Sequence, residues 1–373
     1  MESLTNKQRN PDYVFLILAG LVVFLGLVFL TSASSVLGWQ KFHDSYYYLK
    51  HQIFYGLIPG LILFVVFSRI PYQNLRKLAL PALIFSVLLL VAVFIPGISL
   101  NLGGARRWLN LAGFVFQPSE VVKLTLLLYL AAWLDTRGAD IKSFKKGLLP
   151  FILVAGVILG LIILQPDLGT MSVLAISAFV TYLVAGANIG HLLILASSGM
   201  AGLWFVVKYF SHSAKRLTIF LHPELDPQGI GYHINQALLA VGSGGFWGLG
   251  LGYSRQKYAY LPEVTGDSIF AVVAEELGFV LTLVFIILIG CFLWRGFRIA
   301  QRAPDNFGRY LAVGIVTWLA WQTCINISSM LNILPLTGVP LPFVSAGGTA
   351  LVVCLSAVGI LTNISRYTHK TNV

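Results

Sequence analysis

Long apolar runs recur along this chain and alternate with short polar segments that carry most of the lysines and arginines. A membrane-spanning helix needs about 20 mostly apolar residues to cross about 30 Å of hydrocarbon. Runs of this kind predict about ten spanning helices. Their approximate ranges are 13–31, 52–68, 78–96, 119–134, 148–164, 168–186, 191–209, 268–293, 310–330 and 345–364. The first run lacks the small-residue cleavage site of a signal peptide, so we expect it to be retained as a helix.

The composition excludes the other broad classes of protein. Hydrophobic residues make up 57% of the 373 residues and charged residues only 10%, whereas about 25% charged residues is typical of soluble domains. The mean hydropathy is +0.82. A soluble globule could not bury so much apolar surface, and disorder requires low hydrophobicity with high charge. We therefore predict an all-α polytopic membrane protein that forms one transmembrane domain over residues 1–373.

The basic residues of the short loops predict the orientation, because lysine and arginine concentrate on the cytoplasmic side of a membrane. With the N-terminus in the cytoplasm, the larger basic set falls in short cytoplasmic loops. This set is Lys7, Arg9, Arg69, Arg76, Lys77, Arg137, Lys142, Lys145, Lys146, Arg295, Arg298, Arg302, Arg309, Arg366 and Lys370. Both termini are therefore predicted to be cytoplasmic. The long segment of about 210–267, between the seventh and eighth spans, is then extracytoplasmic.

Two extracytoplasmic segments, about 97–118 and about 210–267, keep further basic residues despite this rule. They contain Arg106, Arg107, Lys215, Arg216, Arg255 and Lys257. Such a cluster favours an anionic ligand; the alternative is that these side chains are solvated or contact lipid headgroups. Although the net charge is +11, no hydrophilic stretch is long enough for a basic domain, so we expect no nucleic-acid partner.

Asp267 follows Gly266 and directly precedes the apolar run of the eighth predicted span. This position predicts an N-cap or first-turn residue, where a carboxylate accepts backbone N–H bonds. The functional alternative is a general base at the membrane–water boundary. Asp167, which precedes Leu168, is likewise predicted to cap the sixth span. No motif of the kind that holds a catalytic metal ion occurs, so the metal requirement stays open.

Charged residues in the fourth and eighth predicted spans lie among apolar residues, where an ionised side chain needs a partner or a water-filled cavity. Lys123 lies in the fourth span, with Glu120 one turn before it, and Glu275 and Glu276 lie in the eighth. We expect Lys123 to pair with Glu275 or Glu276, either as a structural ion pair or as part of a cavity wall. Lys257, by contrast, is expected in a solvated loop.

Arg106, Arg107 and Trp108 follow the glycine pair Gly103 and Gly104 in an outer loop. Arginine binds phosphate groups in a bidentate manner, and tryptophan suits a sugar face or the membrane interface. The triplet is therefore a candidate phosphate site, with an interface anchor as the alternative.

Six segments resemble, in order, the SEDS proteins, the FtsW/RodA group of bacterial cell-wall polymerases. They read TSASS, GGARRWLNLAGFVFQPSEVVKL, QPDLGT, PQGIGYHINQALLAVGSGGFWGLGLG, LPEVTGDSIFAVVAEELG and PLPFVSAGGTALV. The resemblance extends over nearly the whole chain. Three positions differ from the usual family pattern: Gly266 and Ser268 flank Asp267 where the family usually reads T-D-F, and Ala346 stands where it usually has tyrosine.

The resemblance implies an inverting peptidoglycan glycosyltransferase in the bacterial cytoplasmic membrane. Such an enzyme links lipid II into glycan strands at the outer face and releases undecaprenyl pyrophosphate. Asp267 corresponds to the family's essential acid. The resemblance also implies substrate contacts from the outer basic residues, Trp108, Gln236 and Ser345, and a possible Mg²⁺ or Mn²⁺ ion at the phosphates. Implied partners are a class B penicillin-binding protein, other division or elongation proteins, and membrane lipids.

TSASS and the GGT variant favour the FtsW type, which acts in division, over the RodA type, which acts in elongation. Two alternatives of other classes are a lipid II flippase and a non-catalytic scaffold for the penicillin-binding protein. A flippase would need a charged path from the cytoplasmic side, whereas the polar residues here concentrate in the outer half.

Overall fold

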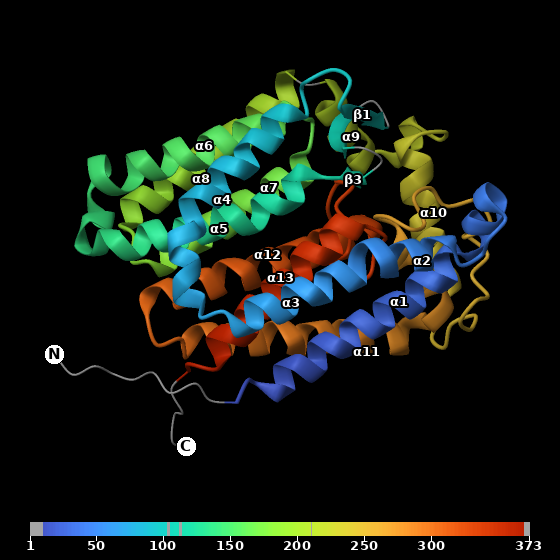
Figure 1. Ribbon diagram of the computed structural model, residues 1–373. Helices are drawn as coiled ribbons and strands as arrows, with labels where there is room; N and C mark the ends of the chain where they lie inside the picture. The colour runs from blue at the N-terminus through green and yellow to red at the C-terminus, as the bar shows by residue number, and fades with distance from the viewer. Residues whose placement is uncertain (1–9, 103–104, 112–113, 210, 369–373) are drawn as a thin grey trace.

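The computed structural model describes residues 10–102, 105–111, 114–209 and 211–368, which fold as a bundle of long helices (Figure 1). Gly103, Gly104, Lys7, Arg9 and Lys370 lie outside this range. Every predicted span coincides with a helix. These are α1 (Tyr13–Phe42), α2 (Tyr47–Gln52) continuing through η1 (Ile53–Leu57) into α3 (Ile58–Arg69), α4 (Tyr72–Ala92), α5 (Pro118–Arg137), η3 (Phe144–Leu148) with α6 (Leu149–Ile163), α7 (Leu168–Val184), α8 (Ile189–Tyr209), α11 (Ile269–Gln301), α12 (Asn306–Met330) and α13 (Gly348–Ser365).

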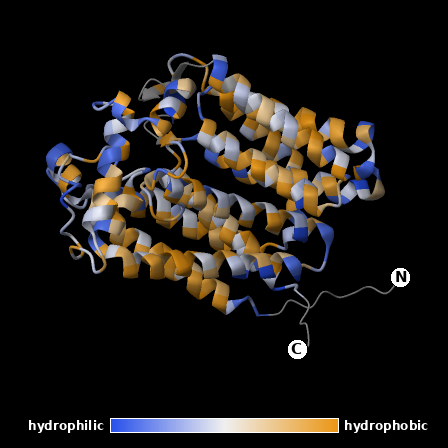
Figure 2. Ribbon diagram, turned by 180° about the vertical axis from the view of Figure 1, so that it is seen from behind, coloured by the Kyte–Doolittle hydropathy of each residue, from blue (hydrophilic) through white to orange (hydrophobic). Residues whose placement is uncertain are grey.

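Eight of these helical segments, within the described part of the chain, are long and apolar enough to cross a membrane. The helix α7 is apolar but shorter, and α5 carries charged residues near both ends. Figure 2 shows hydrophobic residues along the helices and hydrophilic residues gathered at their ends. Large apolar side chains of these helices are exposed, such as Phe24, Leu88 and Ile194, and an apolar exterior matches a lipid environment. The protein is therefore a multi-pass membrane protein, as the sequence predicts.

The helices α12 and α13 form the centre of the bundle. About three quarters of the most apolar part of each is buried, 72% and 78%, against 6% for the peripheral α8. The helix α13 packs along α3, while α12 packs against α5, α7 and α11. Trp318 of α12, fully enclosed, is among the largest buried side chains.

The end of the bundle opposite the chain termini, called the distal end below, carries the non-membrane elements (Figure 1). They include α9 (Ser211–Leu221), η4 (Pro223–Leu225) and α10 (Ile230–Ser243), which lie within the predicted long loop. A small antiparallel sheet, which the hydrophobic pattern does not predict, adds β1 (Ser99–Leu102), β2 (Ala105–Leu111) and β3 (Phe114–Phe116) in the order β1-β2-β3. The short η2 (Gly138–Lys142) lies at the opposite end.

The buried Lys123 pairs within its own helix, so the expected pair with Glu275 or Glu276 is wrong. Its ammonium lies 2.8 Å from Glu120 Oε1 and donates to Gln322 Oε1 at 2.8 Å. The reason is the packing: α12 lies between α5 and α11 and supplies the polar partner itself. A carboxylate one turn away on the same helix also needs no register between helices.

Lys257 is buried, so the expectation of a solvated lysine is also wrong. Its ammonium lies 3.1 Å from Glu276 Oε1, with both side chains about 2% exposed. Glu276 also accepts a hydrogen bond from Ser32 Oγ of α1 at 2.7 Å. The neighbouring Glu275 accepts the Ser254 hydroxyl and backbone N–H groups of the same loop. These two acids therefore hold the loop to α11. The charge of Lys257 is neutralised by Glu276 and does not form an exposed anion site.

One glycine before this loop and one within α11 allow the two backbones to lie directly against each other. A Cβ atom on Gly248 would lie 2.2 Å from the Glu276 carbonyl oxygen, and one on Gly278 would lie 2.1 Å from the Gly248 nitrogen. Gly278 has φ +69°, which interrupts the helical geometry of α11. The freed N–H of Phe279 donates to the Gly245 carbonyl at 2.8 Å. Only glycine tolerates both the contact and the dihedral angle.

We expect Lys257→Met to lower the free energy of unfolding by about 3–5 kcal/mol, because it leaves the Glu276 carboxylate buried without its counter-charge. Thermal unfolding in detergent measures the change. Lys146→Met is the matched control, since Lys146 pairs with Asp140 while 62% exposed, and such surface pairs contribute about 0–1 kcal/mol. Equal stability of the two variants would contradict the buried ion pair.

Candidate functional site

Asp267 lies one residue before the cap of α11, at the distal end of the bundle. The N-cap is Ser268, whose side chain makes no capping hydrogen bond, so the predicted capping role of Asp267 is wrong. Asp267 Oδ1 is buried and accepts no hydrogen bond from any described residue. A buried acceptor that is left unpaired is costly and unusual. The carboxylate therefore has an oxygen available for a proton or a ligand.

Two side chains, one on α12 and one just before α13, hold the backbone at Asp267. Asn326 of α12 donates through Nδ2 to the Asp267 carbonyl and to the Val339 carbonyl, both at 2.8 Å. Ser345, just before α13, donates to the Gly266 carbonyl at 2.7 Å. Asn326 is fully buried. These bonds fix the carboxylate-bearing residue between α12 and the segment that enters α13.

The residues on either side of this pair are held as well. His233 Nε2 of α10 lies 2.6 Å from Ser268 Oγ, and the Ala346 N–H donates to the Thr265 carbonyl at 2.7 Å. Burial, with a smaller contribution from Arg216, lowers the pKa of His233 to about 4. His233 is therefore neutral at pH 7. The small Ser268 permits a hydrogen bond where the bulky aromatic residue usual in the family could form none.

The surroundings of Asp267 favour its protonated form. Burial is the larger cause and the nearby Glu263 carboxylate the second, and together they raise the pKa of Asp267 to about 7; Arg216 partly opposes them. A base with a pKa close to the working pH is well suited to proton transfer.

Two arginines approach Asp267 from different elements. Arg216 of α9 donates to the Leu336 carbonyl at 3.1 Å, in the loop whose Gly338 lies against Asp267. Burial and the charge of Arg107 lower the pKa of Arg216, while Asp267 and Asp167 act in the opposite direction. Two guanidinium groups close enough to repel each other favour the binding of an anion between them.

A β-bulge sets the position of Arg107. On β1 and β2, Leu100 pairs with Trp108 and Asn101 with Arg106, so Arg107 is the extra residue of the bulge. Bulges redirect side chains and are common next to active sites. Arg107 donates to the Gln165 carbonyl at 3.0 Å and to the Pro166 carbonyl.

The junction of α6 and α7 next to Arg107 is capped as predicted. Asp167 accepts the Thr170 N–H at 3.1 Å, which confirms its role as the N-cap of α7.

A groove of about 1070 Å³ lies beside the sheet, between α3, α5 and α13. Polar and aromatic side chains line it near the distal end, among them Tyr48, His51 and Trp108. Apolar residues such as Leu63 and Val352 line it further along the helices. A groove with a polar mouth and an apolar length suits a lipid with a polar headgroup.

The structure does not bring every candidate residue to Asp267. Lys215 pairs with Asp226 at 3.0 Å, Arg255 is exposed on the loop held by Glu275, and Gln236 is half-buried on α10. Arg106 is exposed on β2. The ammonium of Lys257, which the sequence placed with the substrate-binding residues, pairs with Glu276 instead of facing Asp267. Glu120, Lys123, Glu275 and Glu276 form the two buried polar clusters described above.

Sequence reasoning missed Asn326, His233, Glu263 and Gln52. Gln52 accepts the Gly347 N–H at 2.9 Å and so holds the start of α13. An asparagine in the apolar run of 310–330 was the available signal for Asn326, because an unpaired amide is costly in a membrane. Nothing in the sequence distinguishes His233 and Glu263 from ordinary loop residues.

The described residues contain no group of three or more His, Cys, Asp or Glu side chains that could hold a metal ion. Magnesium, however, is often bound by one or two carboxylates together with substrate phosphates. Asp267 and Glu263 could supply such oxygens, so the predicted Mg²⁺ or Mn²⁺ stays a prediction.

Residues 12–370 match the model of the cell cycle protein family FtsW/RodA/SpoVE. The stage V sporulation protein E of Bacillus subtilis (strain 168) is 40% identical over 366 residues, which cover 98% of this chain and 100% of that protein. The probable peptidoglycan glycosyltransferase FtsW of Trichlorobacter lovleyi is 42% identical over 370 residues, covering 98% and 96%.

Solved structures agree with this match. A chain of a peptidoglycan synthase complex, solved to study the coordination of polymerization and crosslinking, superposes with a TM-score of 0.77 at 27% identity, covering 95% of this chain and 98% of that chain. The rod shape determining protein RodA of Thermus thermophilus gives 0.70 at 28% identity, covering 97% and 98%. With the family model matching nearly its entire length, the chain belongs to the FtsW/RodA/SpoVE family of cell cycle proteins.

Proposed function

We propose that this protein is a peptidoglycan glycosyltransferase that polymerises lipid II at the outer face of the bacterial cytoplasmic membrane. The observation that carries the proposal is the unpaired, buried Oδ1 of Asp267, which lies within electrostatic reach of Arg216. A base and an anion site side by side are what transfer from a pyrophosphate donor requires. The relatives named as peptidoglycan glycosyltransferases support it.

In the proposed reaction, Asp267 takes the proton of the acceptor sugar's 4-hydroxyl as that oxygen attacks the anomeric carbon of the donor. The bond between the anomeric carbon and the pyrophosphate oxygen breaks, and undecaprenyl pyrophosphate leaves with the electron pair. An α-linked donor that gives a β-linked product inverts in one displacement, so no covalent enzyme intermediate forms. Asp267 then returns the proton to solvent.

Arg107 and Arg216 would stabilise the negative charge of the leaving group by charge-assisted hydrogen bonds. A Mg²⁺ or Mn²⁺ ion bound by Glu263 would add positive charge at the same phosphates. The groove between α3, α5 and α13 would hold the prenyl chain, because its apolar length runs along the membrane-spanning helices. The distal end then faces the outside of the cell, which agrees with the cytoplasmic termini that the basic loops predict.

We further propose a class B penicillin-binding protein as the partner, since a structural relative comes from a peptidoglycan synthase complex. FtsW and stage V sporulation relatives at about 40% identity favour a role in division or sporulation over elongation. Polymerisation of lipid II by the purified protein tests the proposed function directly. A flippase or a scaffold would form no glycan in that assay.

Asp267→Asn should reduce glycan polymerisation by about 10²–10⁴-fold, the usual contribution of a general base. The amide keeps the shape of the side chain but cannot accept the proton. Polymerisation by the purified variant, with thermal unfolding as the folding check, measures the effect. Asp140→Asn is the matched control, because Asp140 pairs with the exposed Lys146 at the opposite end of the bundle. Wild-type activity in Asp267→Asn would remove the base from the mechanism.

The pH profile of kcat/KM should show an acid limb centred at about 7, the raised pKa of Asp267. Only the carboxylate accepts a proton, so activity should rise with pH through that value and fall about tenfold per unit below it. Glu263→Gln removes one cause of the raised pKa and should move the limb to lower pH. A limb near pH 4 in the wild type would be inconsistent with a buried base.

Arg107→Ala should weaken lipid II use more than Arg106→Ala, because Arg107 lies within the charged cluster whereas Arg106 is exposed. One charge-assisted hydrogen bond contributes about 1.5–3 kcal/mol, which predicts a rise in KM of about tenfold or more. Arg107→Lys should restore only part of the loss, because lysine lacks the planar fork. Equal effects of the two alanine variants would contradict the special position of the bulge residue.

A further inference from the structure

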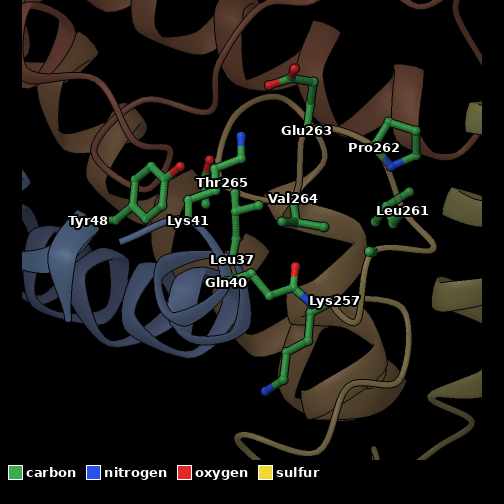
Figure 3. A pocket seen from close by; sticks show the side chains of 11 residues that line it. Leu37, Gln40, Lys41, Tyr48, Lys257, Leu261, Pro262, Glu263, Val264 and Thr265 are labelled. Atoms are coloured by element: carbon green, nitrogen blue, oxygen red, sulfur yellow. The ribbon is translucent and has the colours of Figure 1, made fainter. Parts of the chain in front are cut away.

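A second, smaller cavity of about 240 Å³ lies beside the segment that leads to Asp267. Its walls are the distal end of α1, Tyr48 of α2 and the segment 257–265 (Figure 3). Tyr48 lines both this cavity and the groove, so the two spaces are neighbours. Arg216 lies elsewhere, against the 336–339 loop. The small cavity therefore borders the segment that leads to Asp267, and the groove meets it at Tyr48.

The lining combines polar groups with apolar faces. In Figure 3 the side chains of Lys41, Tyr48 and Thr265 gather on one side of the cavity, whereas the Lys257 ammonium points away from them. Leu37 and Leu261 supply apolar surface. Glu263 adds a carboxylate to the lining. Hydroxyl groups beside apolar walls match a sugar ring, because a sugar presents both hydroxyls and C–H faces, and the Lys41 ammonium matches a carboxylate on a peptide attached to that sugar.

The backbone of the cavity wall is held in an unusual conformation at two positions. Ala259 has φ +68° and Glu263 has φ +51°, and both line the cavity. Residues with a side chain adopt this left-handed region only when the surrounding structure holds them there, and such residues cluster at functional sites.

The turn at Glu263 also links the wall to Asp267. Its carbonyl accepts the N–H of Gly266 at 2.9 Å and that of Ser268 at 3.2 Å. These are the two residues that flank Asp267 in the sequence. The turn that shapes the cavity therefore also sets the position of the carboxylate.

We propose that this cavity binds the acceptor in the polymerisation reaction, as an amino-sugar headgroup that bears a carboxylate, with Lys41 as its cationic contact. The inference rests on the proposed function and adds a substrate subsite to it. The donor's pyrophosphate lies at Arg107 and Arg216, and the acceptor approaches Asp267 from the α1 side. Asp267 then takes the proton of the attacking hydroxyl between the two.

The test uses Lys41→Met and Thr265→Val in the purified full-length protein. Each variant should raise KM for lipid II by about tenfold, the effect of losing one charge-assisted or buried hydrogen bond, and leave kcat within about twofold. A purely structural role would instead lower the active fraction, and hence kcat, at constant KM. Lys41→Arg should keep the wild-type KM. Lys208→Met is the matched control, an exposed lysine at the end of α8 that lines neither cavity.

A binding measurement separates this inference from the proposed function. The probe is the soluble disaccharide–peptide headgroup without pyrophosphate or prenyl chain, titrated by calorimetry. Wild-type protein should bind it, and Lys41→Met should bind it about tenfold more weakly. Absence of glycan from the wild type would overturn the proposed function alone. Unchanged KM and unchanged headgroup binding in both variants would overturn the acceptor subsite while leaving the polymerase intact.

Discussion

The segment 263–268 has no regular structure although helix ends surround it, and the proposed chemistry depends on the hydrogen bonds that hold it there. Buried backbone groups outside a helix need partners, and an apolar environment makes an unpaired one costly. Asn326, Ser345 and the Ala346 N–H satisfy three consecutive carbonyls of this segment. With these three carbonyls satisfied, Asp267 is the one described side chain of the segment that has a buried oxygen without a hydrogen-bond partner.

The need of buried polar groups for partners also separates two kinds of polar residue at the distal end, those that stabilise the fold and those available to a ligand. Glu275, Glu276 and Lys257 neutralise one another and fasten the preceding loop to α11, so they support the site without entering it. Arg107 and Arg216 repel each other, and nothing within hydrogen-bonding distance on the described chain neutralises both. Charges that cancel stabilise a fold, whereas charges of one sign held close together favour a ligand of the opposite sign.

The arrangement also suggests how one carboxylate could serve two substrates. The groove beside the sheet and the cavity beneath α1 meet at Tyr48, and the segment of Asp267 borders the cavity. In an inverting displacement, the acceptor hydroxyl and the leaving pyrophosphate lie on opposite sides of the donor's anomeric carbon, and the base lies on the side of the hydroxyl. In this family member, Gly266 and Ser268 leave more space beside Asp267 than the usual neighbours would, and His233 takes up part of that space through Ser268.

The sequence by itself determined the positions and order of the apolar helices, the family, the cap at Asp167 and the candidate base, because hydrophobic runs and contiguous motifs depend on residues close together in the chain. It could not determine partners across the bundle. Lys123 has Glu120 within its own helix and Gln322 from α12, while Lys257 reaches a glutamate 19 residues away. The bulge that positions Arg107, the amide of Asn326 and the turn at Glu263 were likewise decided by the tertiary structure. Each depends on which helix ends meet, and on the need of buried polar groups for partners wherever the packing places them.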